Sequence, residues 1–354
     1  MFRTLIFVAA SYATVALSLA QAPADPAAKP QVLAVGSPAP ALAVEKWLKG
    51  QPVEKFETGK IYVIDFWSTT NSACLARMPH TTRLQAKYAE QGVTIIGVST
   101  GDFRNSLAAV EKMVAEKSAA MGYTVAWDKG KATKDAFLTA AKQLVIPCSF
   151  LIDKNGTIAY IGDPVFLDVP LAGVLDGTWD GAKHAADYAA LQKDYWAKNS
   201  RLERDPAGLL AFLKEFEARN PMLAHVVAKA KFRAAIANGE FELAASVMPA
   251  LVDEAILGAD AQWLNELSWG FVDPEAKVEN RRLDLALKAA EAAARISAEK
   301  DGAILDTLAR VWFWKGDLQK AFELQTKALA VATERFRAPI QASLDEYKAK
   351  LGNK

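Results

Sequence analysis

Cysteine and histidine are scarce in this chain. Only Cys74 and Cys148, together with His80, His184 and His225, occur among 354 residues. Two cysteines exclude a disulfide-rich scaffold, and no cysteine or histidine has the spacing of a zinc motif. We therefore expect no metal site and no cofactor. The three histidines are expected to be surface or helix-capping residues.

An excess of charge of either sign is also missing. The chain carries 42 basic and 41 acidic residues, a net charge of +1. Nucleic-acid binding, which depends on a clustered basic surface, is therefore not expected. At 51% hydrophobic and 23% charged residues, the composition is typical of a globular protein.

The chain has a single long apolar run, over residues 5–19, which follows Arg3. A basic start, an apolar stretch of this length and small residues ending at Ala20 predict a signal peptide over residues 1–20. The run is too short and too rich in small residues for a convincing membrane span. We therefore expect a periplasmic or secreted protein with no stable membrane span after cleavage, in an oxidising compartment.

The length is sufficient for two domains. Residues 21–35 are rich in alanine and proline and predict a flexible linker. Over residues 36–175, short segments rich in β-branched residues alternate with helical patterns. Strands are expected at 61–66, 93–99, 123–127, 149–153 and 157–161, and helices at 72–90, 103–120 and 133–143. With a tight hairpin turn predicted at Asn155-Gly156, the pattern indicates a mixed sheet with helices on both faces.

Residues 187–354 are helical throughout by pattern. Asn238-Gly239-Glu240 and Lys315-Gly316-Asp317 each introduce a helix with the same order of residue types. The region resembles tetratricopeptide repeats, whose period is about 34 residues and which offer a concave surface to peptides or proteins. A loop insertion near residues 273–280 is expected to interrupt the array, and a generic helical bundle remains the alternative.

An ordered set of motifs in the first domain carries a second resemblance. The set consists of Asp65-Phe66-Trp67, Cys74, Pro79, Val145-Ile146-Pro147 and Phe150-Leu151-Ile152-Asp153-Lys154-Asn155-Gly156. Together with Val35-Gly36-Ser37-Pro38, they resemble the TlpA/ResA-like redoxins of the thioredoxin superfamily over residues 36–162. The resemblance implies a thioredoxin fold, with Pro147 as the cis-proline beside the active site.

In that family the strand leads into a W-C-x-x-C dithiol, and here the position of its first cysteine is Asn71. Disulfide exchange requires an attacking thiolate, which asparagine cannot provide. Asparagine is a strong helix N-cap, so we expect Asn71 to accept a hydrogen bond from the amide of Cys74. The resemblance implies that Asp65 lies beneath Cys74 and assists its deprotonation, and that Trp67 packs against the site.

The two cysteines leave several readings open. Cys74 is either a lone reactive thiol or a small buried apolar residue. By resemblance, the cis-proline loop lies against the dithiol, which places Cys148 near Cys74. A disulfide between them needs Cα atoms within about 7 Å and converging side chains, and alternation along a strand could prevent this. The candidate catalytic residues are therefore Cys74, Cys148, Asp65 and Pro147, with Trp67 in support.

The sequence leaves three functions open. The first is a thiol–disulfide oxidoreductase of altered mechanism, which acts on protein thiols and disulfides through Cys74. The second is an inactive binding module that holds peptide segments or envelope proteins through the helical repeats. A one-cysteine peroxidase is least favoured, because Asn71 stands where the T-x-x-C motif has threonine and no arginine lies at Pro147 to stabilise a departing oxygen.

Overall fold

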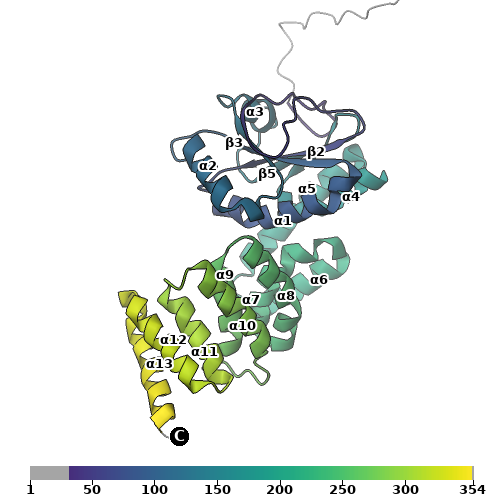
Figure 1. Ribbon diagram of the computed structural model, residues 1–354. Helices are drawn as coiled ribbons and strands as arrows, with labels where there is room; N and C mark the ends of the chain where they lie inside the picture. The colour runs from purple at the N-terminus through teal and green to yellow at the C-terminus, as the bar shows by residue number, and fades with distance from the viewer. Residues whose placement is uncertain (1–31, 353–354) are drawn as a thin grey trace, which may run out of the picture.

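The computed structural model describes residues 32–352. An α/β domain lies above a region made only of helices, and α1 faces the boundary between them (Figure 1). The expected signal peptide and most of the expected linker lie outside the described residues. Leu33, expected in the linker, is buried, and its amide donates to the carbonyl of Ala140 over 3.0 Å. The packed chain therefore begins before residue 36.

The α/β domain is built on a six-stranded mixed sheet in the order β1-β4-β3-β2-β5-β6. Its strands are β1 (Val44–Lys49), β2 (Ile61–Trp67), β3 (Val93–Ser99), β4 (Thr124–Asp128), β5 (Cys148–Ile152) and β6 (Ile158–Gly162). β2, β3 and β4 run parallel, whereas β1, β5 and β6 are antiparallel to their neighbours. The predicted mixed sheet is confirmed, and the hairpin between β5 and β6 turns at Gly156, where φ is +78°.

The sequence analysis missed β1. This edge strand pairs only with β4, through an irregular register. Its sequence, VEKWLK, alternates poorly, and none of its side chains is fully buried. A strand of this kind is held by backbone pairing with its neighbour, so it lacks the apolar periodicity that reveals a strand.

Helices cover both faces of the sheet. One face packs against α1 (Ser72–Tyr88), α2 (Leu107–Glu116) and α4 (Asp168–Asp176), and the other against the turns of α3 (Ala132–Lys134) and η3 (Asp135–Thr139). Side chains of β2 alternate accordingly: Val63 and Trp67 belong to the α1 side, and Ile64 and Phe66 to the η3 side. Short turns η1 (Ala89–Gln91), η2 (Ser118–Ala120) and η4 (Pro164–Phe166) complete the domain.

The helical region starts at α5, earlier than the expected residue 187. Its helices are α5 (Gly181–Arg201), α6 (Pro206–Arg219), α7 (Ala224–Ala237), α8 (Phe241–Leu257), α9 (Ala261–Val272), α10 (Leu283–Ile296), α11 (Gly302–Trp314), α12 (Leu318–Val331) and α13 (Glu334–Gly352), with the turn η5 (Pro221–Leu223). Asp180 caps α5 by accepting hydrogen bonds from the amides of Ala182 and Lys183. Among residues 32–352, no helix is long and apolar enough to cross a membrane.

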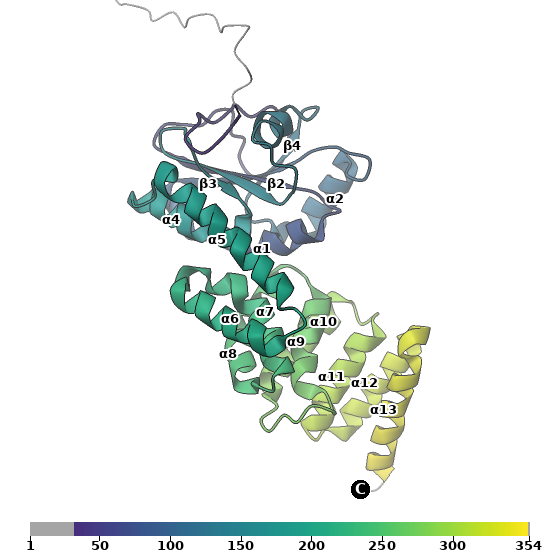
Figure 2. The same cartoon turned by 180° about the vertical axis from the view of Figure 1, so that it is seen from behind.

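The long helix α5 joins the two parts of the chain (Figure 2). Near its start, the Tyr188 hydroxyl donates to the carbonyl of Phe166 in the α/β domain over 2.8 Å. Near its end, the Tyr195 hydroxyl donates to the carbonyl of Val226 in the helical region over 3.1 Å. One helix is therefore anchored in both parts.

Small residues allow close helix packing near the C-terminal end. Ala321 and Ala328 of α12 are fully buried. A Cβ at Gly302, the first residue of α11, would lie 2.8 Å from the backbone of Ala328 and Ala332, so only glycine fits there. The segment 273–282 between α9 and α10 is not helical, where a loop insertion was predicted.

Candidate functional site

Asn71 forms the start of α1 and ties it to the cis-proline loop. Its Oδ1 accepts a hydrogen bond from the amide of Cys74 over 3.1 Å, so the predicted N-cap is confirmed. Its Nδ2 donates to the carbonyl of Ile146 over 3.0 Å, and the Ile146-Pro147 peptide bond is cis. The second bond was not predicted. It joins the start of α1 to the residue that precedes the cis-proline.

Asp65 is buried beneath this site, at 4% exposure. It lies directly opposite Ser149 in the β2–β5 pairing, and the Ser149 hydroxyl donates to Asp65 Oδ1 over 2.9 Å. Burial raises the pKa of Asp65 to about 7, and nearby Asp163 adds to this rise, whereas Ser149 and Arg77 oppose it. Asp65 is therefore able to hold or accept a proton near neutral pH.

The raised pKa predicts how stability depends on pH. Folded Asp65 keeps its proton up to about pH 7, whereas an unfolded aspartate releases it near pH ~4. The folded state binds more protons between these values, so its stability falls as pH rises across that window, by at most about 1.4 kcal/mol per pH unit. We expect the stability of the parent relative to Asp65→Asn to fall by about 2–3 kcal/mol between pH 5 and pH 8.

Chemical denaturation of both chains at the two pH values measures this difference. Asparagine keeps an oxygen for the Ser149 hydrogen bond and cannot ionise, so effects of other titrating groups cancel in the comparison. If the stability of the parent relative to Asp65→Asn instead rose with pH, Asp65 would be charged in the folded state.

The two cysteines lie in different core clusters. Cys74 is 2% exposed and packs with Trp67 on the α1 side of the sheet. Cys148 is 3% exposed and lies opposite Phe66 on the η3 side. Both are free thiols. The disulfide left open by the sequence is not formed, because strand alternation directs Cys148 to the other face of the sheet.

Neither thiol is activated. Burial raises the pKa of Cys74 to about 12, and the charge of Asp65 contributes further. Burial likewise raises the pKa of Cys148 to about 12. A thiolate is the nucleophile in thiol chemistry, so at neutral pH both residues are in the unreactive form.

Trp67 is almost fully buried and belongs to the same core cluster as Cys74. Gly97 on the adjacent strand β3 leaves room for it. A Cβ there would lie 3.1 Å from Trp67 Nε1 and 2.8 Å from the ring of Tyr123. The close packing holds the end of β2, and with it the loop that leads to Asn71.

Asn105 holds a second loop against the site and was missed by the sequence analysis. It is buried, and its Oδ1 accepts hydrogen bonds from the amide and the hydroxyl of Thr69, over 3.1 and 2.7 Å. Its Nδ2 donates to Ser99 Oγ over 2.9 Å. An asparagine in a loop usually indicates only a turn, so the sequence carried no signal for this role.

Arg77 and Asp163 form a bidentate ion pair on the α1 side of the sheet. Arg77 Nε and Nη2 donate to the two carboxylate oxygens of Asp163 over 3.1 and 3.2 Å. The guanidinium group also lies 5.6 Å from the ring of Trp196 on α5. The pair therefore connects α1, the end of β6 and α5.

Exposed apolar side chains lie in the two loops that are tied to the start of α1. Leu144 and Val145, which precede the cis-proline, are 93% and 75% exposed. Phe103, in the loop held by Asn105, is 89% exposed. The Asn71–Ile146 and Thr69–Asn105 hydrogen bonds bring both loops to the start of α1. We call Phe103, Leu144 and Val145 the apolar rim.

The mixed sheet, the helix starting after β2 and the cis-proline loop beside it define a thioredoxin-like domain of the redoxin class. Residues 35–161 match the model of the AhpC/TSA family. The chain belongs to this family.

The chain is similar to several known proteins over this domain. Protein FixW of Rhizobium leguminosarum is 30% identical over 151 residues, which cover 42% of this chain and 68% of FixW. The thiol-disulfide oxidoreductase ResA of Bacillus thuringiensis is 33% identical, over 37% of this chain and 70% of ResA. A thioredoxin domain of a thiol-disulfide oxidoreductase from Bacteroides vulgatus is 29% identical, covering 36% and 86% of the two chains, with a TM-score of 0.31.

Proposed function

We propose that this chain is an exported redoxin that has kept the polypeptide-docking site of its family and lost disulfide exchange. The observation that carries the proposal is the bridge made by Asn71. Its side chain joins Cys74 and Ile146 where an attacking thiol would have to be. Export rests on the signal-peptide pattern of residues 1–20.

The state of the two thiols supports the loss of disulfide exchange. Cys74 is buried, has a raised pKa and has no second thiol on its side of the sheet. A mixed disulfide with a substrate requires an accessible thiolate. Retained oxidoreductase activity through Cys74, the other function proposed from the sequence, would require α1 to open at its first turn.

The apolar rim supports binding. Exposed apolar patches mark surfaces that bind a partner, and three exposed apolar side chains lie in the two loops at the start of α1. An extended polypeptide with apolar side chains fits this site, because it would cover the rim beside the cis-proline loop. The helical region, proposed to be tetratricopeptide-like, would offer a second surface for the same or another protein partner.

Binding of an unfolded polypeptide tests the proposal. We expect carboxymethylated α-lactalbumin, which is permanently unfolded and has no free thiols, to bind the parent chain. Leu144→Ser combined with Val145→Ser should weaken binding at least about fivefold, because full burial of each apolar side chain contributes about 1.5–3 kcal/mol. Fluorescence anisotropy measures the affinity.

Val331→Ser is the matched control, because Val331 is 41% exposed on α12, far along the chain from the site. It should leave binding unchanged. The proposal fails if the rim variant binds as well as the parent. It also fails if the parent catalyses insulin reduction and Cys74→Ser abolishes that activity, which would favour the oxidoreductase.

A further inference from the structure

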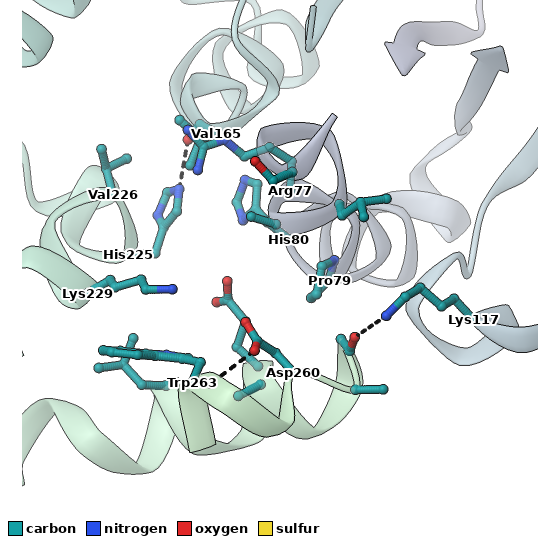
Figure 3. A pocket seen from close by; sticks show the side chains of 18 residues that line it. Arg77, Pro79, His80, Lys117, Val165, His225, Val226, Lys229, Asp260 and Trp263 are labelled. Atoms are coloured by element: carbon teal, nitrogen blue, oxygen red, sulfur yellow. Dashed lines mark hydrogen bonds between the residues drawn. The ribbon is translucent and has the colours of Figure 1, made fainter. Parts of the chain in front are cut away.

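Titratable side chains line a cavity of about 350 Å³ between the α/β domain and the helical region. Figure 3 shows the His80 and His225 rings facing each other at one end of this cavity. The sequence analysis expected these histidines on the surface, but His80 is 5% exposed, so this prediction was wrong for His80. Asp168 Oδ2 lies 2.9 Å from Nε2 of His80 and 3.2 Å from Nε2 of His225, so both rings share one carboxylate.

The other charges around this cavity offset one another. Arg77 is paired with Asp163, and Glu254 is paired with Arg83. The remaining charged side chains in the lining are Lys117, Lys229 and Asp260. Together with Asp168, these two lysines and one aspartate carry no net charge. The cavity therefore offers no surplus charge of either sign to a partner.

A surplus of positive charge lies instead at the apolar rim. Phe103 belongs to residues 100–105, and Leu144 and Val145 belong to residues 129–146. These two segments hold five basic and two acidic residues, which are Arg104, Lys129, Lys131, Lys134 and Lys142 against Asp102 and Asp135. The whole chain has a net charge of only +1, so the positive surplus at the rim is local.

The basic side chains of the rim segments are unpaired. None of the five forms an ion pair with a carboxylate of residues 32–352. The two acids bind locally instead. Asp102 Oδ1 accepts from the amides of Arg104 and Asn105 over 2.7 and 2.9 Å, and Asp135 accepts from the Thr139 hydroxyl over 2.9 Å. The positive charges are therefore available to an anionic partner.

Lys134 lies where the two rim segments meet. It lines a crevice of about 60 Å³ together with Asp102 of one segment and Ile146 of the other. The buried side chains in the same lining include Phe66, Val98 and Leu138. Since a water molecule takes about 30 Å³ of the liquid, the crevice has room for a small apolar side chain. A carboxylate next to that side chain in a bound polypeptide would be within reach of Lys134.

Two further cations flank the apolar rim. Arg104 follows Phe103, and its guanidinium carbon lies 4.9 Å from the centre of that ring. Lys142 precedes Leu144 by two residues. Figures 1 and 2 show α3, which ends at Lys134, on the side of the α/β domain that faces away from the helical region. The helical region therefore leaves this surface uncovered.

We propose that the polypeptide held at the apolar rim is acidic, with aspartate or glutamate residues next to its apolar side chains. This inference rests on the docking function proposed above and names the class of polypeptide. The apolar side chains would cover the rim, and the carboxylates would meet Arg104, Lys134 and Lys142. Opposite charges around an interface speed association and disfavour partners of the wrong charge. A crevice that accepts one side chain favours a polypeptide over an anionic lipid surface.

Two extended peptides of equal length test the proposal. Both carry the same apolar residues, which glutamate flanks in one peptide and lysine in the other. We expect the full chain to bind the glutamate peptide at least about tenfold more tightly, because several exposed charge pairs change from attraction to repulsion. The difference should shrink as the salt concentration rises, since salt screens exposed charges. Fluorescence anisotropy measures both affinities.

Lysine variants make the test specific. Lys134→Gln combined with Lys142→Gln removes two cations, leaves the apolar rim intact and should reduce the preference for the glutamate peptide at least about threefold. Lys193→Gln combined with Lys348→Gln is the matched control, because it changes the net charge equally at exposed positions on α5 and α13. The control should keep the preference of the parent.

The outcomes separate this proposal from the docking function. Equal affinity for both peptides, lost in the Leu144→Ser, Val145→Ser variant, would overturn the acidic preference and leave the docking function standing. Failure of both peptides to bind would overturn both proposals. An unchanged preference in the Lys134→Gln, Lys142→Gln variant would overturn the role of these cations. Binding to phosphatidylglycerol vesicles without discrimination between the peptides would assign the surface to a membrane and overturn the proposal.

Discussion

Asn71→Cys is expected to give this chain a disulfide-reducing activity at least about 100-fold above that of the parent. The new thiol would lie at the N-terminus of α1, where the helix dipole lowers a thiol pKa. Cys74, three residues later, would resolve the mixed disulfide. Asp65, with a pKa of about 7, would accept the proton of Cys74. Turbidity in a dithiothreitol-driven insulin assay measures the rate.

Two variants make the comparison specific. Asn71→Cys combined with Cys74→Ser should stop at the mixed disulfide, which mass spectrometry would detect. Asn71→Ser keeps an N-cap without a thiol and should remain inactive. If Asn71→Cys folds and its rate stays at that of Asn71→Ser, the equivalence of residue 71 with the attacking position is wrong.

Phe166→Ala is expected to be the most destabilising substitution considered, at about 3–5 kcal/mol. Phe166 is fully buried in η4. Its ring makes edge contacts with Tyr188, Tyr195 and Trp196 of α5, with ring centroids 5.9 to 6.3 Å apart. Truncation would leave a cavity between the α/β domain and the helix that joins it to the helical region.

Urea denaturation followed by tryptophan fluorescence measures this loss. Phe103→Ala removes the same side chain at 89% exposure and should change stability by less than about 0.5 kcal/mol. If Phe166→Ala lost as little stability as Phe103→Ala, the fold would not depend on the aromatic contacts between Phe166 and α5.

The fold was predictable wherever the chain is apolar and regular. β2, β3 and the start of α1 were predicted to within a residue, because their buried side chains leave a periodic pattern. The polar edge strand β1 left no such pattern. α2 proved shorter than its predicted range because Ser106 caps it, accepting from the amide of Ala109.

The Asn71 cap could be predicted because it is a local contact, made three residues along the chain. The partners that complete the site could not, since Asn105 and Ile146 reach it only after the sheet has formed. The same reason hid the histidine pair. His80 and His225 lie in different parts of the chain, and only the packing of the helical region against α1 brings their rings together.

The pairing of β2 has a consequence for the order in which the chain folds. Asp65 and Ser149, opposite each other at the site, are 84 residues apart. Contacts of such separation slow folding, because a long loop must close before any of them forms. The helices from α9 to α12 contact mainly their neighbours in sequence and can assemble pair by pair. The C-terminal part, although synthesised last, is therefore the part able to fold fastest, and the sheet that carries the site sets the overall rate.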